Sequence, residues 1–151
     1  METLDFLIDG FKVALTLENF TLALIGCVLG TIFGALPGLG PANGVAILIP
    51  LSFSLGLSPA SSMILLASVY YGAMYGGRIS SILLNIPGDE PAMMTCLDGY
   101  PMTKQGRAGE ALTLTGIASF FGAMFATIGL VLLAPQLVKV ALLFGPVEYF
   151  A

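Results

Sequence analysis

The sequence predicts an all-α polytopic membrane protein whose helices are interrupted at proline–glycine breaks. Only 9% of the residues are charged, whereas soluble domains carry roughly 25%, and the mean hydropathy is +0.97. No charged residue occurs from Asn19 through Gly77, although one membrane crossing needs only about 20 residues. The apolar runs are continuous, whereas the strands of a membrane β-barrel alternate apolar and polar residues. A bundle of membrane helices is therefore the predicted fold class.

The composition also argues against several functional classes. The chain has no histidine and only two, widely separated cysteines, so a zinc site, a disulfide framework and Ser-His-Asp or Cys-His catalysis have little to build on. The net charge is −4, and no basic patch suggests nucleic-acid binding. We therefore predict that the chain is no enzyme, carries no cofactor and binds no nucleic acid.

The first predicted elements are an interfacial helix and a membrane helix. Residues 1–18 mix apolar and charged positions in a way that suits an amphipathic helix lying at the membrane surface. Residues 19–36 form the first predicted span. Within it Gly26, Gly30 and Gly34 recur every fourth residue and share one face, which predicts that another helix approaches closely there.

A proline–glycine break follows at residues 37–41. Its free backbone N–H and C=O groups cannot face lipid, so it must be buried in protein or line a polar cavity. Pro41 suits the first position of the next helix, residues 42–57, which Pro50 should kink. Broken helices of this kind are where secondary transporters bind substrates and coupling ions.

The third apolar segment covers residues 58–77 and repeats the four-residue glycine spacing with Gly72 and Gly76. Residues 79–86 are too short to span a membrane and end at the break Pro87-Gly88. We therefore predict a re-entrant or unwound segment over 79–86.

Most of the charge lies in residues 88–110, which we predict to be a polar loop with a turn at 98–101. Arg107 and Glu110 are spaced for an ion pair. The whole chain, 1–151, is predicted to be the N-terminal part of a single transmembrane transporter domain. Its parts are an interfacial helix over 1–18, broken membrane helices over 19–87, a polar loop over 88–110 and further membrane segments over 111–145, of which 135–145 is short.

The two breaks are predicted to line a substrate path. Gly38 and Gly40 leave room for a ligand to touch the backbone, and a helix beginning at Pro41 would direct free N–H groups at the break, which suits a carboxylate. A tight turn between packed helices is an equally weighted alternative. The candidate substrate-binding residues are Pro37, Gly38, Leu39, Gly40, Pro41, Asn43, Arg78, Ser80, Ser81, Asn85, Pro87 and Gly88.

Arg78 ends the uncharged stretch, and an ionisable group at membrane depth is a functional candidate. Its guanidinium could clamp a carboxylate, or instead snorkel to the interface or pair with Asp89 or Glu90. The hydroxyl of Ser81 and the amide of Asn85 could contribute to a sodium site. No confident metal site is predicted.

Five motifs occur in order along nearly the whole chain: GALPGLGP at 34–41, YYGAMYGG at 70–77, LNIPG at 84–88, TCLDGYP at 95–101 and QGRAG at 105–109. Together they resemble the TctA family, the large membrane subunits of tripartite tricarboxylate transporters. Relatives often place a small hydroxyl residue where this chain has Arg78. By that comparison Arg78 would tune this protein for a more highly charged anion.

The resemblance implies a multi-pass protein of the inner (plasma) membrane that imports organic anions on an ion gradient, often of sodium. It also implies two partners, a small membrane subunit and an extracytoplasmic solute-binding protein. Family members are considerably longer and consist of two related halves, so this chain would be half of an inverted-repeat transporter. The breaks at 37–41 and 85–88 would line its substrate and ion path.

The predicted function is thus import of tricarboxylates or related organic anions, driven by sodium or protons. The absence of histidine, and of any carboxylate in residues 19–77, favours sodium. Two alternatives stay open at this point, a passive anion channel and a non-transporting membrane scaffold subunit.

Overall fold

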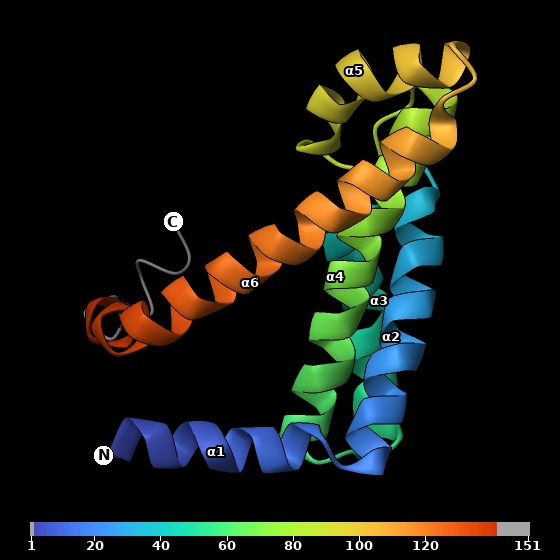
Figure 1. Ribbon diagram of the computed structural model, residues 1–151. Helices are drawn as coiled ribbons and strands as arrows, with labels where there is room; N and C mark the ends of the chain where they lie inside the picture. Colours follow the sequence, from blue (N-terminus) through green and yellow to red (C-terminus); the bar gives the residue numbers. More distant parts are fainter. Residues whose placement is uncertain (1, 142–151) are drawn as a thin grey trace. The chain divides into compact units, whose positions relative to one another are not determined.

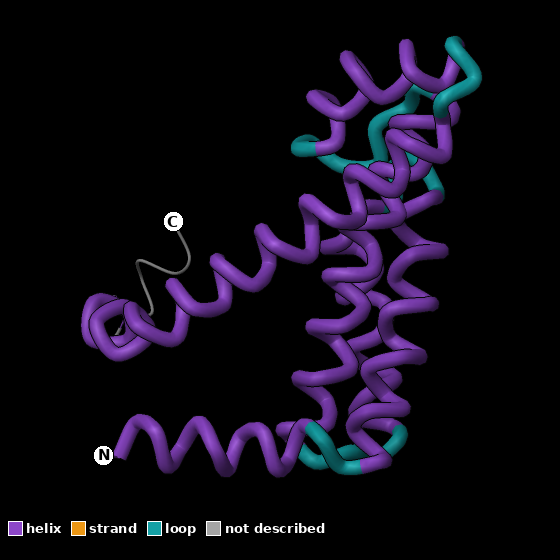
Figure 2. The backbone as a smooth tube through the Cα atoms, viewed as in Figure 1, coloured by secondary structure: helices purple, strands orange, loops and turns teal. Residues whose placement is uncertain are grey.

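The computed structural model describes residues 2–141, and this part of the chain is helical with no β-strand (Figures 1 and 2). The predicted all-α class is therefore confirmed for the described residues. The helices are α1 Glu2–Ala14, α2 Leu17–Ala35, α3 Gly40–Ser54, α4 Pro59–Leu84, α5 Ala92–Lys104 and α6 Ala108–Ala141.

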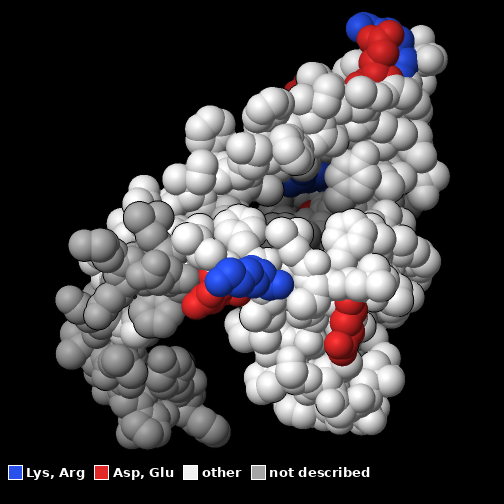
Figure 3. Space-filling model, turned by 60° about the horizontal axis from the view of Figure 1, so that its bottom comes forward, with Lys and Arg blue, Asp and Glu red and all other residues white. Residues whose placement is uncertain are grey.

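Two of the described helices are long and apolar enough to cross a membrane by length and composition, α2 and residues Ala108–Ala134 of α6. Large apolar side chains on α2 are exposed, including Val28 at 60% and Ile32 at 54%. Charged side chains occupy only a few places on the face shown in Figure 3. These features agree with a membrane location, while the number of crossings and the inverted repeat stay predictions.

The chain divides into two compact units, residues 1–113 and 114–151. The first unit contains α1 to α5 and the start of α6. In it α2, α3 and α4 lie side by side (Figure 1). Leu48, Leu65 and Val69 form a buried apolar cluster between α3 and α4. In the second unit the described residues, 114–141, continue α6.

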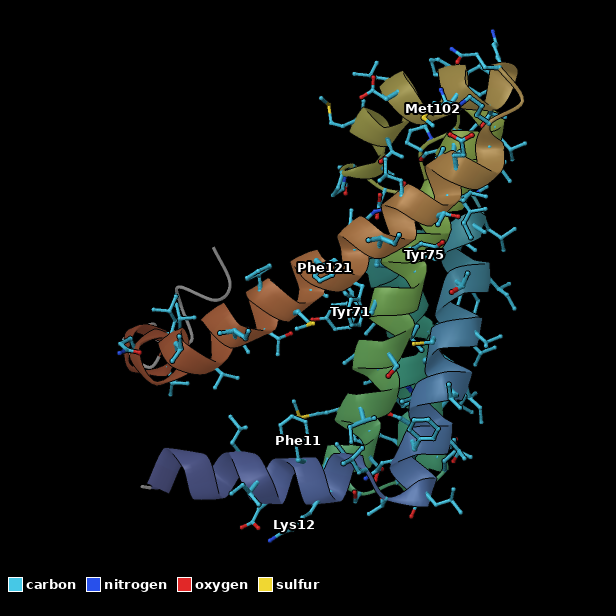
Figure 4. The ribbon with its side chains drawn as sticks, viewed as in Figure 1. Phe11, Lys12, Tyr71, Tyr75, Met102 and Phe121 are labelled. Atoms are coloured by element: carbon cyan, nitrogen blue, oxygen red, sulfur yellow. The ribbon has the colours of Figure 1, made fainter. Side chains whose placement is uncertain are left out.

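The junction of α1 and α2 differs from the predicted boundary at residue 18. α2 begins at Leu17 because the Thr16 hydroxyl accepts the backbone N–H of Asn19 at 3.4 Å and so caps the helix. The buried Asn19 amide donates to the Val13 carbonyl at 2.7 Å and ties the two helices together. Phe11 and Lys12 lie on opposite sides of α1 (Figure 4), as an amphipathic helix requires.

Glycines on both helices form a seam between α2 and α4. They are Gly26, Gly30 and Gly34 on α2, and Gly72 and Gly76 on α4. A methyl group on Gly26 would lie 2.8 Å from the Leu65 carbonyl oxygen, and one on Gly30 would collide with the backbone of Val69. The close approach predicted from the glycine spacing is confirmed, because no larger residue fits at this distance between backbones.

The predicted re-entrant segment over 79–86 is wrong for residues 79–84, which continue α4 without interruption. The Gly76-Gly77 pair does not break the helix because both residues are used for packing, Gly76 against α2 and Gly77 against Gly88. α4 ends instead at Asn85, which caps it with a left-handed φ of 58°. The break at Pro87-Gly88 then follows directly.

The predicted polar loop over 88–110 contains the helix α5, so that prediction is wrong for most of the segment. The turn expected at 98–101 lies inside this helix, including Pro101. Gly99 is needed for packing rather than for a turn, since a methyl group there would lie 2.7 Å from Ile82 Cγ1. The Thr103 hydroxyl donates to the Ile82 carbonyl at 2.7 Å and fixes α5 on α4.

Two further predictions concern α6. The ion pair between Arg107 and Glu110 is confirmed, at 2.6 Å between Nη2 and Oε2. α6 runs through position 135 to Ala141, so the predicted separate segment 135–145 is wrong as far as residue 141; positions 142–145 lie outside the described residues. Pro50 lies inside α3, and the kink expected there stays a prediction.

Candidate functional site

A pocket of about 410 Å³ lies where the two predicted breaks meet. Residues 38–43, 87–90 and Met93 line it. They come from the connection between α2 and α3, the first turn of α3, the loop after α4 and the first turn of α5. A methyl group on Gly40 would lie 3.8 Å from the Gly88 carbonyl oxygen, so the two breaks are neighbours in space.

Glycine contacts hold the second break in place. A methyl group on Gly88 would lie 2.5 Å from Gly77 Cα and 2.6 Å from the Gly34 carbonyl oxygen. The loop therefore rests directly on the backbones of α2 and α4. Close contacts among Gly34, Gly77 and Gly88 fix the position of this loop, and the loop forms one wall of the pocket.

Two helices begin at this pocket. α3 begins at Gly40 with Pro41 in its first turn, and Leu39 before it makes no side-chain cap hydrogen bond. α5 begins at Ala92, whose backbone N–H donates to Asp89 Oδ1 at 2.9 Å. The N-terminal end of a helix carries partial positive charge and free N–H groups, so α3 favours an anion here.

The side chains of the lining have the opposite charge. Asp89 and Glu90 are both acidic, and no lysine or arginine is among the residues that line the pocket. Asp89 is half-buried and Glu90 is exposed. Asp89 Oδ2 is shielded from solvent and has no hydrogen-bond partner among the described residues. The pocket thus combines a helix end that attracts anions with carboxylates that repel them.

The structure brings together seven of the twelve candidate residues in this lining, namely Gly38, Leu39, Gly40, Pro41, Asn43, Pro87 and Gly88. Pro37, Arg78, Ser80, Ser81 and Asn85 do not line it. Ser80 and Ser81 are buried, and their hydroxyls donate to the Gly77 carbonyl at 3.0 and 2.7 Å within α4. A sodium site at Ser81 and Asn85 stays a prediction.

Asp89, Glu90 and Met93 line the pocket but are not among the site residues that the sequence predicts. The available signal was their position, because Asp89 and Glu90 come directly after the break and are the first carboxylates beyond the uncharged stretch. The sequence instead predicts a polar loop here, because charge runs between apolar segments are usually exposed. The start of α5 places them at the pocket instead.

The residues that build this pocket lie within a family match. The model of the tripartite tricarboxylate transporter TctA family matches residues 20–151. The chain belongs to the TctA family. The resemblance seen in its motifs is thereby confirmed, and TctA is a family of transporters rather than of enzymes.

Two curated relatives are similar to this TctA chain. An uncharacterized 52.8 kDa protein of Agrobacterium vitis is 45% identical over 151 residues, which cover 100% of this chain and 30% of that protein. An uncharacterized protein of Methanocaldococcus jannaschii is 31% identical over 108 residues, 71% of this chain and 26% of that protein. The TctA chain thus spans less than a third of the length of these relatives. No solved structure matches it.

Proposed function

We propose that this chain forms part of the large membrane subunit of a secondary transporter that imports tricarboxylates or related organic anions. In this proposal the subunit is a multi-pass protein of the inner membrane. It works with a small membrane subunit and with an extracytoplasmic solute-binding protein that delivers the anion. Membership of the TctA family supports these assignments.

The observation that carries the proposal is the meeting of the two breaks in one pocket at the start of α3. Backbone N–H groups of the first turn of α3, together with the Asn43 side chain, are suited to hold a carboxylate of the substrate. Pockets between broken helices are where secondary transporters bind their substrates, because only there can free backbone groups be satisfied. Transport would follow by alternating access around this pocket.

A sodium gradient is the proposed driving force, with protons as the alternative. A proton-coupled path commonly uses carboxylates or histidines within the membrane. The chain has no histidine and residues 19–77 contain no carboxylate, whereas Asp89 and Glu90 line the pocket and make protons the alternative. The side chains of Asn43, Asp89 and Glu90 in the lining carry oxygen atoms, which suit a hard cation.

Uptake of labelled citrate into proteoliposomes tests this function. The full-length transporter would be reconstituted with its small subunit and binding protein, with and without an imposed sodium gradient. Saturable uptake that needs the binding protein and follows the gradient is the expected result. Gradient-independent, non-saturating flux would instead indicate a passive channel, and a correctly assembled complex without flux of any tested carboxylate would indicate a scaffold subunit.

A further inference from the structure

One face of α4 carries polar side chains that lie outside the pocket. Tyr71, Tyr75 and Arg78 follow one another at spacings of four and three residues, so their side chains are neighbours on the same face of the helix. Gly72 and Gly76 lie on a different face, which packs against the backbone of α2. The face with the two tyrosines and the arginine therefore points away from the glycine seam, as the Tyr71 side chain does in Figure 4.

The charge of this face is positive. α4 contains no aspartate or glutamate, and Arg78 is its only charged residue. In the sequence Arg78 is also the only lysine or arginine between Lys12 and Lys104. A guanidinium presents its N–H donors in a planar fork that matches a carboxylate, and each tyrosine hydroxyl can donate one further hydrogen bond. Three donor side chains on one face of one helix thus suit the carboxylates of an organic anion.

These side chains lie near the middle of a long helix and are nevertheless accessible. Tyr71 is the thirteenth of the 26 residues of α4 and is 58% exposed, while Tyr75 and Arg78 are half-buried. A helix of 26 residues is about 39 Å long, whereas the hydrocarbon of a bilayer is about 30 Å thick. Ionisable groups at membrane depth are unfavourable against lipid and usually mark a path for ions or substrates. This face is therefore suited to line such a path.

The same face lies close to the wall of the pocket along α4. Gly77 directly precedes Arg78, and a methyl group on Gly77 would lie 3.4 Å from Gly88 Cα. Gly88 lines the pocket, whereas Arg78 and the two tyrosines do not. An anion bound at Arg78 would thus be a neighbour of the pocket without occupying it.

We propose, on the basis of the anion-transport function proposed above, that Arg78, Tyr71 and Tyr75 form a second anion-binding position on α4. It binds a substrate anion on its way to or from the pocket, in addition to the anion in the pocket. The guanidinium pairs with a carboxylate through two parallel hydrogen bonds, and the tyrosine hydroxyls donate to carboxylate oxygens. Such bonds are stronger in a medium of low dielectric constant than in water, so a position at membrane depth selects for negative charge.

Equilibrium dialysis against labelled citrate tests this position in the purified full-length large subunit with its small subunit. We expect Arg78→Gln to bind one citrate fewer per large subunit than the wild type. Tyr71→Phe and Tyr75→Phe each remove a hydroxyl and keep the ring, so they should weaken the binding of that same citrate by about three- to tenfold. Because each of these two changes removes a single oxygen atom, they test the position even where Arg78→Gln does not assemble.

Tyr70→Phe is the matched control. Tyr70 is 45% exposed, and its ring meets that of Tyr71 edge to face at 6.4 Å between centroids. It nevertheless lies off the row formed by positions 71, 75 and 78. Phenylalanine keeps the ring contact, so Tyr70→Phe should bind as many citrates as the wild type and with the same affinities. Equal losses in Tyr70→Phe and Tyr71→Phe would overturn the assignment.

Asn43→Ala separates the second position from the pocket, because Asn43 lines the pocket and lies on α3. It should weaken citrate binding in the pocket and keep the citrate bound at Arg78. A wild-type number of citrates, bound with wild-type affinity, in Arg78→Gln would overturn the second position and leave the proposed function intact. Arg78 would then pair with Asp89 or Glu90, or lie at the membrane interface. A wild type that binds neither citrate nor any other carboxylate would overturn both.

Discussion

Gly88 lies directly on Gly77, so that a methyl group on Gly88 would be 2.5 Å from Gly77 Cα. This contact joins the loop after α4 to Gly77, which lies inside α4 itself. The same methyl group would lie 2.6 Å from the Gly34 carbonyl oxygen of α2. The position of the pocket therefore depends on a junction at which only glycine fits.

Gly88→Ala tests this junction. Both neighbouring atoms belong to backbone and cannot rotate away, so the loop must shift. We expect a loss of stability of about 1–3 kcal/mol, typical of overpacking, together with a higher citrate concentration for half-maximal uptake. Thermal unfolding in detergent and proteoliposome uptake measure the two effects. Gly10→Ala is the matched control, because a methyl group there meets nothing within 4 Å; a similar loss in both variants would contradict the assignment.

The glycine seam between α2 and α4 leads to a second prediction. A methyl group on Gly30 would collide with the backbone of Val69, so Gly30→Ala should force the helices apart and destabilise the protein by about 1–3 kcal/mol. Val28→Ala, two residues away and 60% exposed, should change stability much less. The melting temperatures of the two variants, measured in the same detergent, test this prediction. Equal melting temperatures would show that the glycine seam does not limit how closely α2 and α4 pack.

The attachment of α5 to α4 can be tested at Thr103. Its hydroxyl donates to the Ile82 carbonyl at 2.7 Å and also lies 3.2 Å from the Gly99 carbonyl oxygen. Thr103→Val removes this link and should cost about 0.5–1.5 kcal/mol, with faster hydrogen exchange of the α5 amides. Thr113→Val is the control, since that hydroxyl bonds only within its own helix, to the Gly109 carbonyl. Unchanged exchange in Thr103→Val would mean that other contacts hold α5.

The parts of the fold that were predicted correctly follow from constraints that the membrane imposes on sequence. The spacing of Gly26, Gly30 and Gly34 predicts a close helix contact, and the structure places α4 there. The breaks at 37–41 and 85–88 were predicted to be buried or to line a polar cavity because free backbone groups cannot face lipid, and their role in binding a substrate stays a prediction. Residues 38–41 of the first break and Pro87 and Gly88 of the second line the same pocket.

The predictions failed where contacts with another part of the fold, rather than local backbone preference, determine the role of a residue. Gly99 and Pro101 are typical of a turn, yet both lie inside α5, where Gly99 makes room for Ile82. The sequence predicts that an apolar segment ends at Gly77, whereas in the structure Gly77 lies inside α4 and contacts Gly88. Asp89 was missed as a site residue because its role depends on α5, and that helix was not predicted.

The two asparagines near the breaks lead to the last prediction. Asn43 lines the pocket, so Asn43→Ala should raise the citrate concentration for half-maximal uptake on the order of tenfold, the usual effect of losing one hydrogen bond worth about 1.4 kcal/mol.

Asn85 caps α4 with φ at 58° and does not line the pocket. Asn85→Gly keeps this backbone conformation, because glycine adopts positive φ without strain, and should leave citrate uptake unchanged. If Asn85→Gly instead raises the sodium concentration that transport requires, the sodium site lies at Ser81 and Asn85, as the sequence predicts.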